Sequence, residues 1–144
     1  AERLHDVRLA LAARVALGYA TARAGYLDRA QATLEQARDE ARELEDPLWE
    51  ARARIGLADV LAGQGDPAAA QLALDPLREY PLPKPLRARV RLAQLAVDWA
   101  AGERGQIGEQ LEAIAANARE RGWGELEREA HARLTSVRAS ERMG

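Results

Sequence analysis

The stretch AARVALGYATARAGYLDRAQATLEQAR, residues 12–38, decides the fold. It is interpreted as a helix, a turn at Gly25 and a second helix that returns along the first, because glycine readily adopts the left-handed conformation that closes a helix. The same turn recurs 40 residues later at Gly65, and it recurs after another 40 residues at Gly105. A constant period of this length, with helical spacing inside each unit, is typical of stacked helical repeats.

Apolar positions follow the same 40-residue shift. The shift superimposes Leu17, Leu57 and Val97; Val15, Ile55 and Leu95; and Leu34, Leu74 and Ile114. We therefore expect an all-α fold, a right-handed α-solenoid of helical hairpins with about seven helices. The expected units span about residues 7–46, 47–86 and 87–123, and a terminal helix follows at about residues 124–142.

Turn signals bound the expected helices, which lie at about residues 3–24, 27–45, 47–64, 67–79, 86–103, 106–121 and 125–138. Asp46-Pro47 favours a helix start, since aspartate caps a helix and proline suits the first turn. Pro76 is expected to kink the fourth helix or to end it early, and residues 80–85 are expected to be extended.

Apolar stripes predict which side chains face the core. In the first helix these are Leu4, Val7, Leu11, Val15 and Leu17, and in the fourth they are Leu72, Leu74 and Leu77. The sixth helix offers Ile107, Leu111, Ile114, Ala115 and Ala118, and the seventh offers Leu126, Ala130, Leu134 and Val137.

The length and composition of the chain indicate a single folded domain. The 144 residues suit one domain, and with 47% hydrophobic and 31% charged residues the chain is not expected to be disordered. A net charge of −2 gives no general attraction to nucleic acid or to an anionic membrane, so neither is an expected partner. With no signal peptide and no apolar run of about 18 residues, we expect a cytoplasmic location. The start at Ala1 without Met suggests a piece excised from a longer protein.

The spacing from Leu17-Gly18 through Gly25 to Ala30 and Leu34 resembles the tetratricopeptide repeat (TPR). The second unit is similar, with Leu57-Ala58, Gly65-Asp66, Ala70 and Leu74, and the third is degenerate. The chain departs from the family in its period of 40 rather than 34 residues, and at the early Trp position, where it has Arg14, Arg54 and Gln94. Long units rich in Ala and Arg, joined by LEDPL at residues 44–48, also resemble the repeat regions of MalT-like, LuxR-type bacterial transcriptional regulators.

The resemblance implies a binding surface, because in tetratricopeptide arrays the first helix of each unit lines a concave groove. The lining residues are then expected to be Val15, Tyr19, Arg23, Arg52, Ile55, Asp59, Leu95, Trp99 and Glu103. Tyr19, Asp59 and Trp99 are equivalent by the 40-residue shift. Two aromatic rings around a carboxylate would suit a peptide or a small effector with apolar and cationic parts. The alternative is that Tyr19 and Trp99 only pack within the solenoid.

The titratable residues suggest no catalytic site. Glu127 and His131 lie one helical turn apart, but they lack the third ligand that a catalytic zinc ion needs. The basic cluster of Lys84, Arg87, Arg89 and Arg91 is interpreted as a solvated face. We expect no enzymatic activity, no metal and no cofactor.

The expected function is therefore that of a non-catalytic binding module within a signalling or transcriptional regulator. Its partner would be a protein segment or peptide, or a small effector, held in the concave face. The alternative is a structural or oligomerisation segment, in which the terminal helix and Trp123 dock onto a neighbour and produce a homo-oligomer.

Overall fold

The computed structural model describes residues 2–143 of the chain, which form seven α-helices and one 3-10 turn. The helices are α1 (Glu2–Arg23), α2 (Leu27–Glu43), α3 (Pro47–Gly63), α4 (Pro67–Leu74), α5 (Lys84–Ala100), α6 (Ile107–Arg121) and α7 (Gly124–Met143). The 3-10 turn η1 (Asp75–Arg78) follows α4 directly. The prediction of an all-α chain of about seven helices is confirmed.

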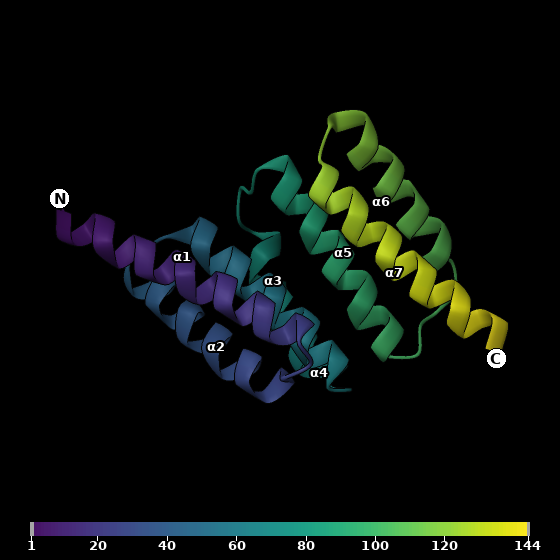
Figure 1. Cartoon of the computed structure of the whole chain (residues 1–144), viewed down its shortest axis with the longest axis horizontal. Helices are drawn as coiled ribbons and strands as arrows, with labels where there is room; N and C mark the ends of the chain where they lie inside the picture. Colours follow the sequence, from purple (N-terminus) through teal and green to yellow (C-terminus); the bar gives the residue numbers. More distant parts are fainter. Residues whose placement is uncertain (1, 144) are drawn as a thin grey trace.

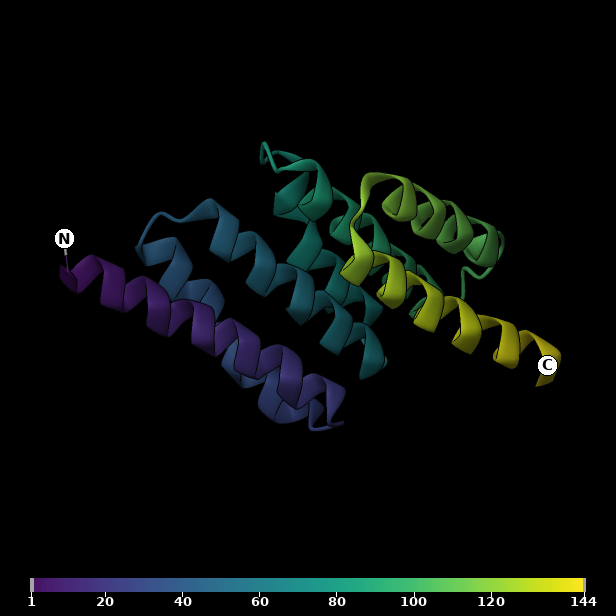
Figure 2. The ribbon, with the colours of Figure 1, turned by 45° about the horizontal axis from the view of Figure 1, so that its top comes forward.

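Each helix packs against the next one in the sequence, and α1 also contacts α3, α3 contacts α5, and α5 contacts α7. The odd-numbered helices therefore form a continuous row. They run in one common direction, and the even-numbered helices run the opposite way (Figures 1 and 2). The two ends of the chain lie at opposite ends of the molecule (Figure 1).

Helix starts follow the local sequence signals. Asp46 and Asp66 each precede a proline, and their side chains accept the backbone N–H of Trp49 at 3.2 Å and of Ala69 at 3.1 Å. Each cap thus satisfies one of the N–H groups that a helix start leaves without a partner. Asp46-Pro47 begins α3, as predicted.

Pro76 shortens the fourth helix as expected, because proline supplies no N–H and crowds the preceding turn. The α-helix ends at Leu74, and the chain continues as the 3-10 turn. A non-helical segment then leads to α5 at Lys84. The Arg87 guanidinium fastens this segment by donating to the backbone carbonyls of Leu77, at 2.8 Å, and Tyr80. The Arg87 side chain is therefore half-buried and bonded to this segment, so the interpretation of Arg87 as part of a solvated face was wrong.

The third turn departs from the expected period. Gly25 and Gly65 have left-handed φ values of 91° and 81°, but in the third unit Gly102, with a φ of 86°, takes this role instead of Gly105. The N–H of Glu103 donates to the carbonyl of Asp98 at 2.9 Å and closes α5 there. The turn therefore lies three residues earlier than the 40-residue period predicts.

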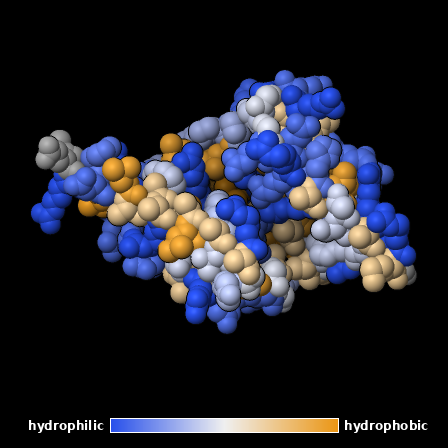
Figure 3. Space-filling model, viewed as in Figure 1, coloured by the Kyte–Doolittle hydropathy of each residue, from blue (hydrophilic) through white to orange (hydrophobic). Residues whose placement is uncertain are grey.

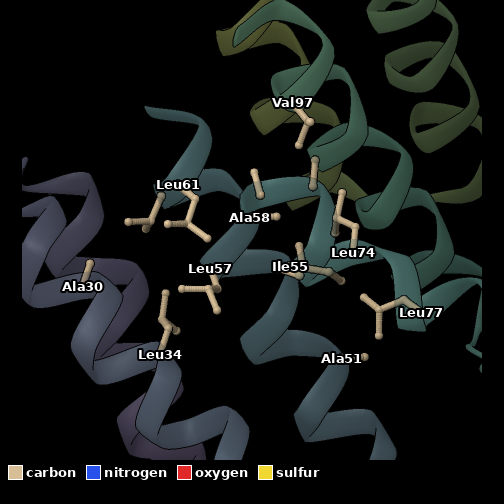
Figure 4. Packing of buried hydrophobic residues seen from close by; sticks show 14 of the residues in the cluster. Ala30, Leu34, Ala51, Ile55, Leu57, Ala58, Leu61, Leu74, Leu77 and Val97 are labelled. Atoms are coloured by element: carbon tan, nitrogen blue, oxygen red, sulfur yellow. The ribbon is translucent and has the colours of Figure 1, made fainter. Parts of the chain in front are cut away.

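The core surrounds α3 and continues to the C-terminal end. A central cluster joins α2, α3, α4 and α5, and in Figure 4 Leu34 of α2 and Leu57 of α3 point toward each other. A second cluster lies between α5, α6 and α7, and a third joins α1, α2 and α3. The predicted apolar stripes of α6 and α7 are buried throughout, so both are confirmed.

Four residues expected in the core are exposed. Leu17 is 58% exposed and Leu72 is 70% exposed, because each lies two positions from a buried residue and so points roughly 200° away from it around the helix. Leu4 and Val7 are 46% and 40% exposed, because the first turns of α1 extend beyond the part of the helix that packs on α2 (Figure 1). Leu11 is the first core residue of α1.

Candidate binding site

A hollow of about 590 Å³ lies where α3, α5, α6 and α7 meet. Its apolar lining consists mainly of Leu92, Leu95 and Trp99 from α5, Ile107 and Leu111 from α6, and Val137 from α7. Its polar lining consists of Asp59 from α3 with Arg133, Ser136 and Ser140 from α7. Side chains from helices far apart in the sequence thus form one largely apolar recess.

Trp99 is the aromatic residue of the hollow. It is half-buried and packs against the cluster that joins α5, α6 and α7. The guanidinium of Arg104, in the turn after α5, lies 4.0 Å from the centroid of the Trp99 ring. This cation–π contact holds the ring at the rim without enclosing it fully.

Asp59 and Arg133 form a bidentate ion pair beside the hollow. The guanidinium nitrogens of Arg133 donate to the two carboxylate oxygens of Asp59 at 3.2 and 2.9 Å. They also donate to the backbone carbonyl of Leu92 at 3.3 Å and to Glu129 at 3.0 Å. One side chain of α7 is thereby tied to both α3 and α5, and its donors are used within the fold.

Burial and the neighbouring charges have opposite effects on the pKa values of Asp59 and Arg133. Burial raises the pKa of Asp59 above its ordinary value, and the nearby Arg133 charge only partly offsets this effect. Burial lowers the pKa of Arg133, but the charges of Asp59 and Glu129 outweigh burial and hold that pKa above its ordinary value. Arg133 therefore stays charged, and its charge is already matched by carboxylates.

The polar network extends to α5 through Glu129. Arg89 donates to Glu129 at 2.7 Å and lies 3.7 Å from Glu125. Asp59, Arg133, Glu129 and Arg89 thus form a chain of two acids and two bases that joins α3, α5 and α7. Because these charges balance, the rim of the hollow offers no uncompensated acid to attract a cationic ligand.

Tyr19 is a packing residue between α1 and α3. A Cβ atom added to Gly56 would lie 2.1 Å from Cε1 of Tyr19, so the ring rests directly on the glycine backbone. The Tyr19 hydroxyl donates to the backbone carbonyl of Arg52 at 2.5 Å. Burial raises the pKa of Tyr19 above its ordinary value, and the Asp59 charge adds to the increase. These contacts favour the packing interpretation of Tyr19 over the groove interpretation.

The nine expected groove residues do not come together. Asp59, Leu95 and Trp99 line the hollow. Val15 and Ile55 are buried in the core at 3% and 4% exposure and do not line the hollow. Arg23 and Glu103 are exposed near helix ends, and exposed Arg52 stacks on Trp49 with its guanidinium carbon 4.6 Å from the ring centroid.

The expected row of Tyr19, Asp59 and Trp99 forms only in part, because Asp59 and Trp99 line the hollow and Tyr19 does not. Tyr19 precedes Gly25 by six residues and Asp59 precedes Gly65 by six, whereas Trp99 precedes Gly102 by only three. At about 100° per residue, a displacement of three residues leaves Trp99 on the same side of its helix, about 60° around from the equivalent position and roughly one turn farther along the axis. The Asp59 carboxylate is paired with Arg133 and the Tyr19 ring packs on Gly56, so an arrangement of two aromatic rings around one free carboxylate does not form.

Sequence reasoning missed the contribution of α6 and α7 to the hollow. The sequence places Ile107, Leu111 and Val137 on apolar stripes that face the core, and it gives no sign of a site at Arg133. The spacing of Glu129 and Arg133 indicates an ion pair within one helix, but no local signal connects Arg133 to Asp59, which lies 74 residues earlier.

Glu127 and His131 are the remaining candidates for a metal site. His131 Nε2 lies 3.7 Å from Glu127, and within residues 2–143 no three His, Cys, Asp or Glu residues gather closely enough to hold a metal ion. A second hollow lies over the turn between α1 and α2, where Gln64 donates to Asp28 at 2.9 Å.

In the part of the chain that the structure describes, no helix is both long and apolar enough to cross a membrane.

Comparison with known proteins adds no identification. No protein-family profile, curated protein sequence or solved structure matches the chain. The class that the fold defines is an all-α protein built from neighbouring antiparallel helices.

Proposed function

We propose that the chain is a non-catalytic binding module that holds a segment of another protein in the hollow between α3, α5, α6 and α7. The observation that carries the proposal is the hollow itself, whose lining combines leucine and isoleucine side chains with the half-buried Trp99. A volume of about 590 Å³ lies within the range of pockets that receive ligands, and a partly exposed Trp is a frequent anchor of binding surfaces.

The architecture we propose for this module is a right-handed α-solenoid of tetratricopeptide-like hairpins. The row of odd-numbered helices supports it, as do the equivalent turns at Gly25 and Gly65. In such an array each unit contacts only its neighbours, and the row of first helices presents a continuous surface to a partner. The setting we propose, from the sequence resemblance alone, is a signalling or transcriptional regulator.

The chemistry of the hollow specifies the kind of segment. Its apolar wall favours a bulky apolar side chain, such as Leu, Met or Phe, since burying such a group stabilises a complex by about 1.5–3 kcal/mol. The serine hydroxyls of Ser136 and Ser140 are exposed and are available to the backbone of a peptide. Because Asp59 and Arg133 neutralise each other, the ligand does not need a charged group.

The alternative role of α7 as a self-association helix is less well supported. Leu134, on its apolar stripe, is only 5% exposed because it packs in the cluster with α6. The outward-facing residues of α7 include Arg128, His131 and Thr135. A helix whose apolar side is already covered has little left to offer a second copy.

The experiment is selection of binding peptides from a random displayed library, followed by affinity measurement on variants. Ala132→Trp fills the mouth of the hollow from an exposed position, and Ala116→Trp, on the exposed side of α6, is the matched control. We expect selected peptides to share a bulky apolar residue, and we expect Ala132→Trp and Trp99→Ala to weaken them about tenfold or more, with Ala116→Trp unchanged. Peptides that bind Ala132→Trp as tightly as the original chain, or failure to select any, would count against the proposal. A small effector would instead appear as binding that peptides do not compete for.

A further inference from the structure

The outward face of α1 is unusually apolar for an exposed helix. Leu9 and Leu17 are 56% and 58% exposed, and Ala13, Ala16 and Ala20 are exposed on the same helix. These five residues, here named the α1 stripe, recur at helical spacing and so share one side of the helix. Figure 3 shows orange and tan atoms following α1 across the left half of the molecule.

The two ends of the helix row differ in this respect. At the other end, α7 turns Arg128, His131 and Thr135 outward. In repeat arrays the terminal units normally carry a polar outer face, because that face has no neighbour to cover it. By this criterion α7 has the surface of an end unit, and α1 has the surface of an internal one.

The α1 stripe matches a surface that is covered elsewhere in the same chain. The 40-residue shift pairs Leu9 with Trp49, Ala13 with Ala53, Ala16 with Gly56, Leu17 with Leu57, and Ala20 with Val60. In α3 all of these partners are buried or half-buried. Of the other helices, α2 packs most extensively against α3, and Tyr19 of α1 also covers Gly56.

The contacts of α2 with α3 show what such a surface accepts. Ala53 lies in a cluster with Ala37 and Ala41 of α2, and Leu57 lies in a cluster with Leu34. A Cβ atom added to Gly56 would be 3.2 Å from Cδ1 of Leu34, so this leucine packs beside the small residue, next to the Tyr19 ring that lies directly over it. Small residues on both helices allow the close approach that the leucine requires.

We propose that the α1 stripe is a docking surface for an amphipathic helix of the α2 kind. The occupant carries one leucine flanked by alanines on a single face, with the spacing of Ala30, Leu34, Ala37 and Ala41, and it lies antiparallel to α1 as α2 lies to α3. Its leucine packs against Leu17 and beside Ala16, as Leu34 packs against Leu57 and beside Gly56. Docking of this helix extends the row at the α1 end, away from the hollow.

The complementarity favours this occupant over a second α1. The surface on α3 contacts one leucine of α2, and the other buried residues of α2 are alanines. The α1 stripe has the same order of small residues and leucine as that surface on α3. Two α1 stripes facing each other would present leucine and alanine without the defined partner positions that α2 supplies. The test must therefore distinguish self-association through α1 from docking of an α2-like helix.

The probe is a fluorescein-labelled peptide with the sequence of residues 26–45, which contains α2, titrated into the full chain. We expect saturable binding that weakens about tenfold or more in Leu17→Glu, because a charge would be buried against the docked helix. The matched control is Val7→Glu, which places the same charge on the same helix at an exposed site outside the stripe. A peptide carrying Leu34→Ser should bind neither variant nor the original chain.

Three results would overturn the proposal. One is the absence of peptide binding, and another is equal binding to the original chain and to Leu17→Glu, which would indicate that the peptide displaces the chain's own α2. The third is a concentration-dependent dimer of the original chain in sedimentation that Leu17→Glu converts to monomer, since a second copy would then occupy the stripe.

Discussion

Asp59 in α3 and Arg133 in α7 are joined by two hydrogen bonds, of 3.2 and 2.9 Å, although 74 residues separate them in the sequence. This pair is the polar link between the middle of the helix row and its C-terminal end. It stands at the edge of the hollow, so it also fixes how far α7 lies from α3 and how wide the hollow is.

Removing one member of this pair should destabilise the fold modestly. The two side chains are 29% and 26% exposed, so we expect Arg133→Ala and Asp59→Ala each to lower the free energy of unfolding by about 1 kcal/mol. Urea unfolding of both single variants and of the double variant would give a coupling energy of about 0.5–1 kcal/mol. A coupling energy of zero would show that the two side chains do not stabilise each other.

Gly56 should not tolerate even a methyl group. Because a Cβ atom there would lie 2.1 Å from the Tyr19 ring, we expect Gly56→Ala to destabilise the chain by about 1–3 kcal/mol despite the higher helix propensity of alanine. Gly63→Ala, in the same helix but 3.5 Å from its nearest neighbour atom, is the control and should be neutral or stabilising. Thermal unfolding followed by circular dichroism tests both, and equal effects would contradict the close contact.

Two leucines that are equivalent in the sequence should respond differently to truncation. Leu57 is 2% exposed, so Leu57→Ala is expected to cost about 2–4 kcal/mol, whereas Leu17 is 58% exposed and Leu17→Ala should change stability by less than about 0.5 kcal/mol. Denaturant unfolding at low protein concentration measures both. Similar losses for the two variants would mean that the α1 stripe is covered within a single chain.

Tyr19 should make the fold sensitive to alkali. Its pKa is raised in the folded chain, so the folded state keeps the phenol proton above pH 10, where an unfolded tyrosine loses it. This contribution to stability is complete below the unfolded pKa and is lost as the pH rises above it. We expect Tyr19→Phe to lose less stability than the original chain between about pH 9 and 11. Parallel pH profiles for the two chains would rule out a buried phenol.

Much of the fold could be predicted because its signals are local. Asp46-Pro47 marks a helix start, Pro76 ends α4, and the clean stripes of α6 and α7 identify their buried sides. Leu17 was misplaced because α1 is rich in alanine on several sides, so the apolar pattern does not select one face.

The candidate site was only partly predictable, because it depends on relations that no short window contains. Glycines at both 102 and 105 fit a helix end, and choosing the wrong one shifts Trp99 by three residues relative to Tyr19. The ion pair between Asp59 and Arg133 depends on how α7 returns over α3 and α5, which follows from packing of the complete chain.

The central claim is that the hollow receives an apolar side chain of a partner, and nuclear magnetic resonance tests it most directly. A peptide selected on the chain would be titrated into labelled protein while the methyl signals of Leu92, Leu95 and Val137 and the indole signal of Trp99 are followed. We predict that these signals shift and saturate together, with little change at the α1 stripe. Saturating shifts confined to residues outside the hollow would contradict the account.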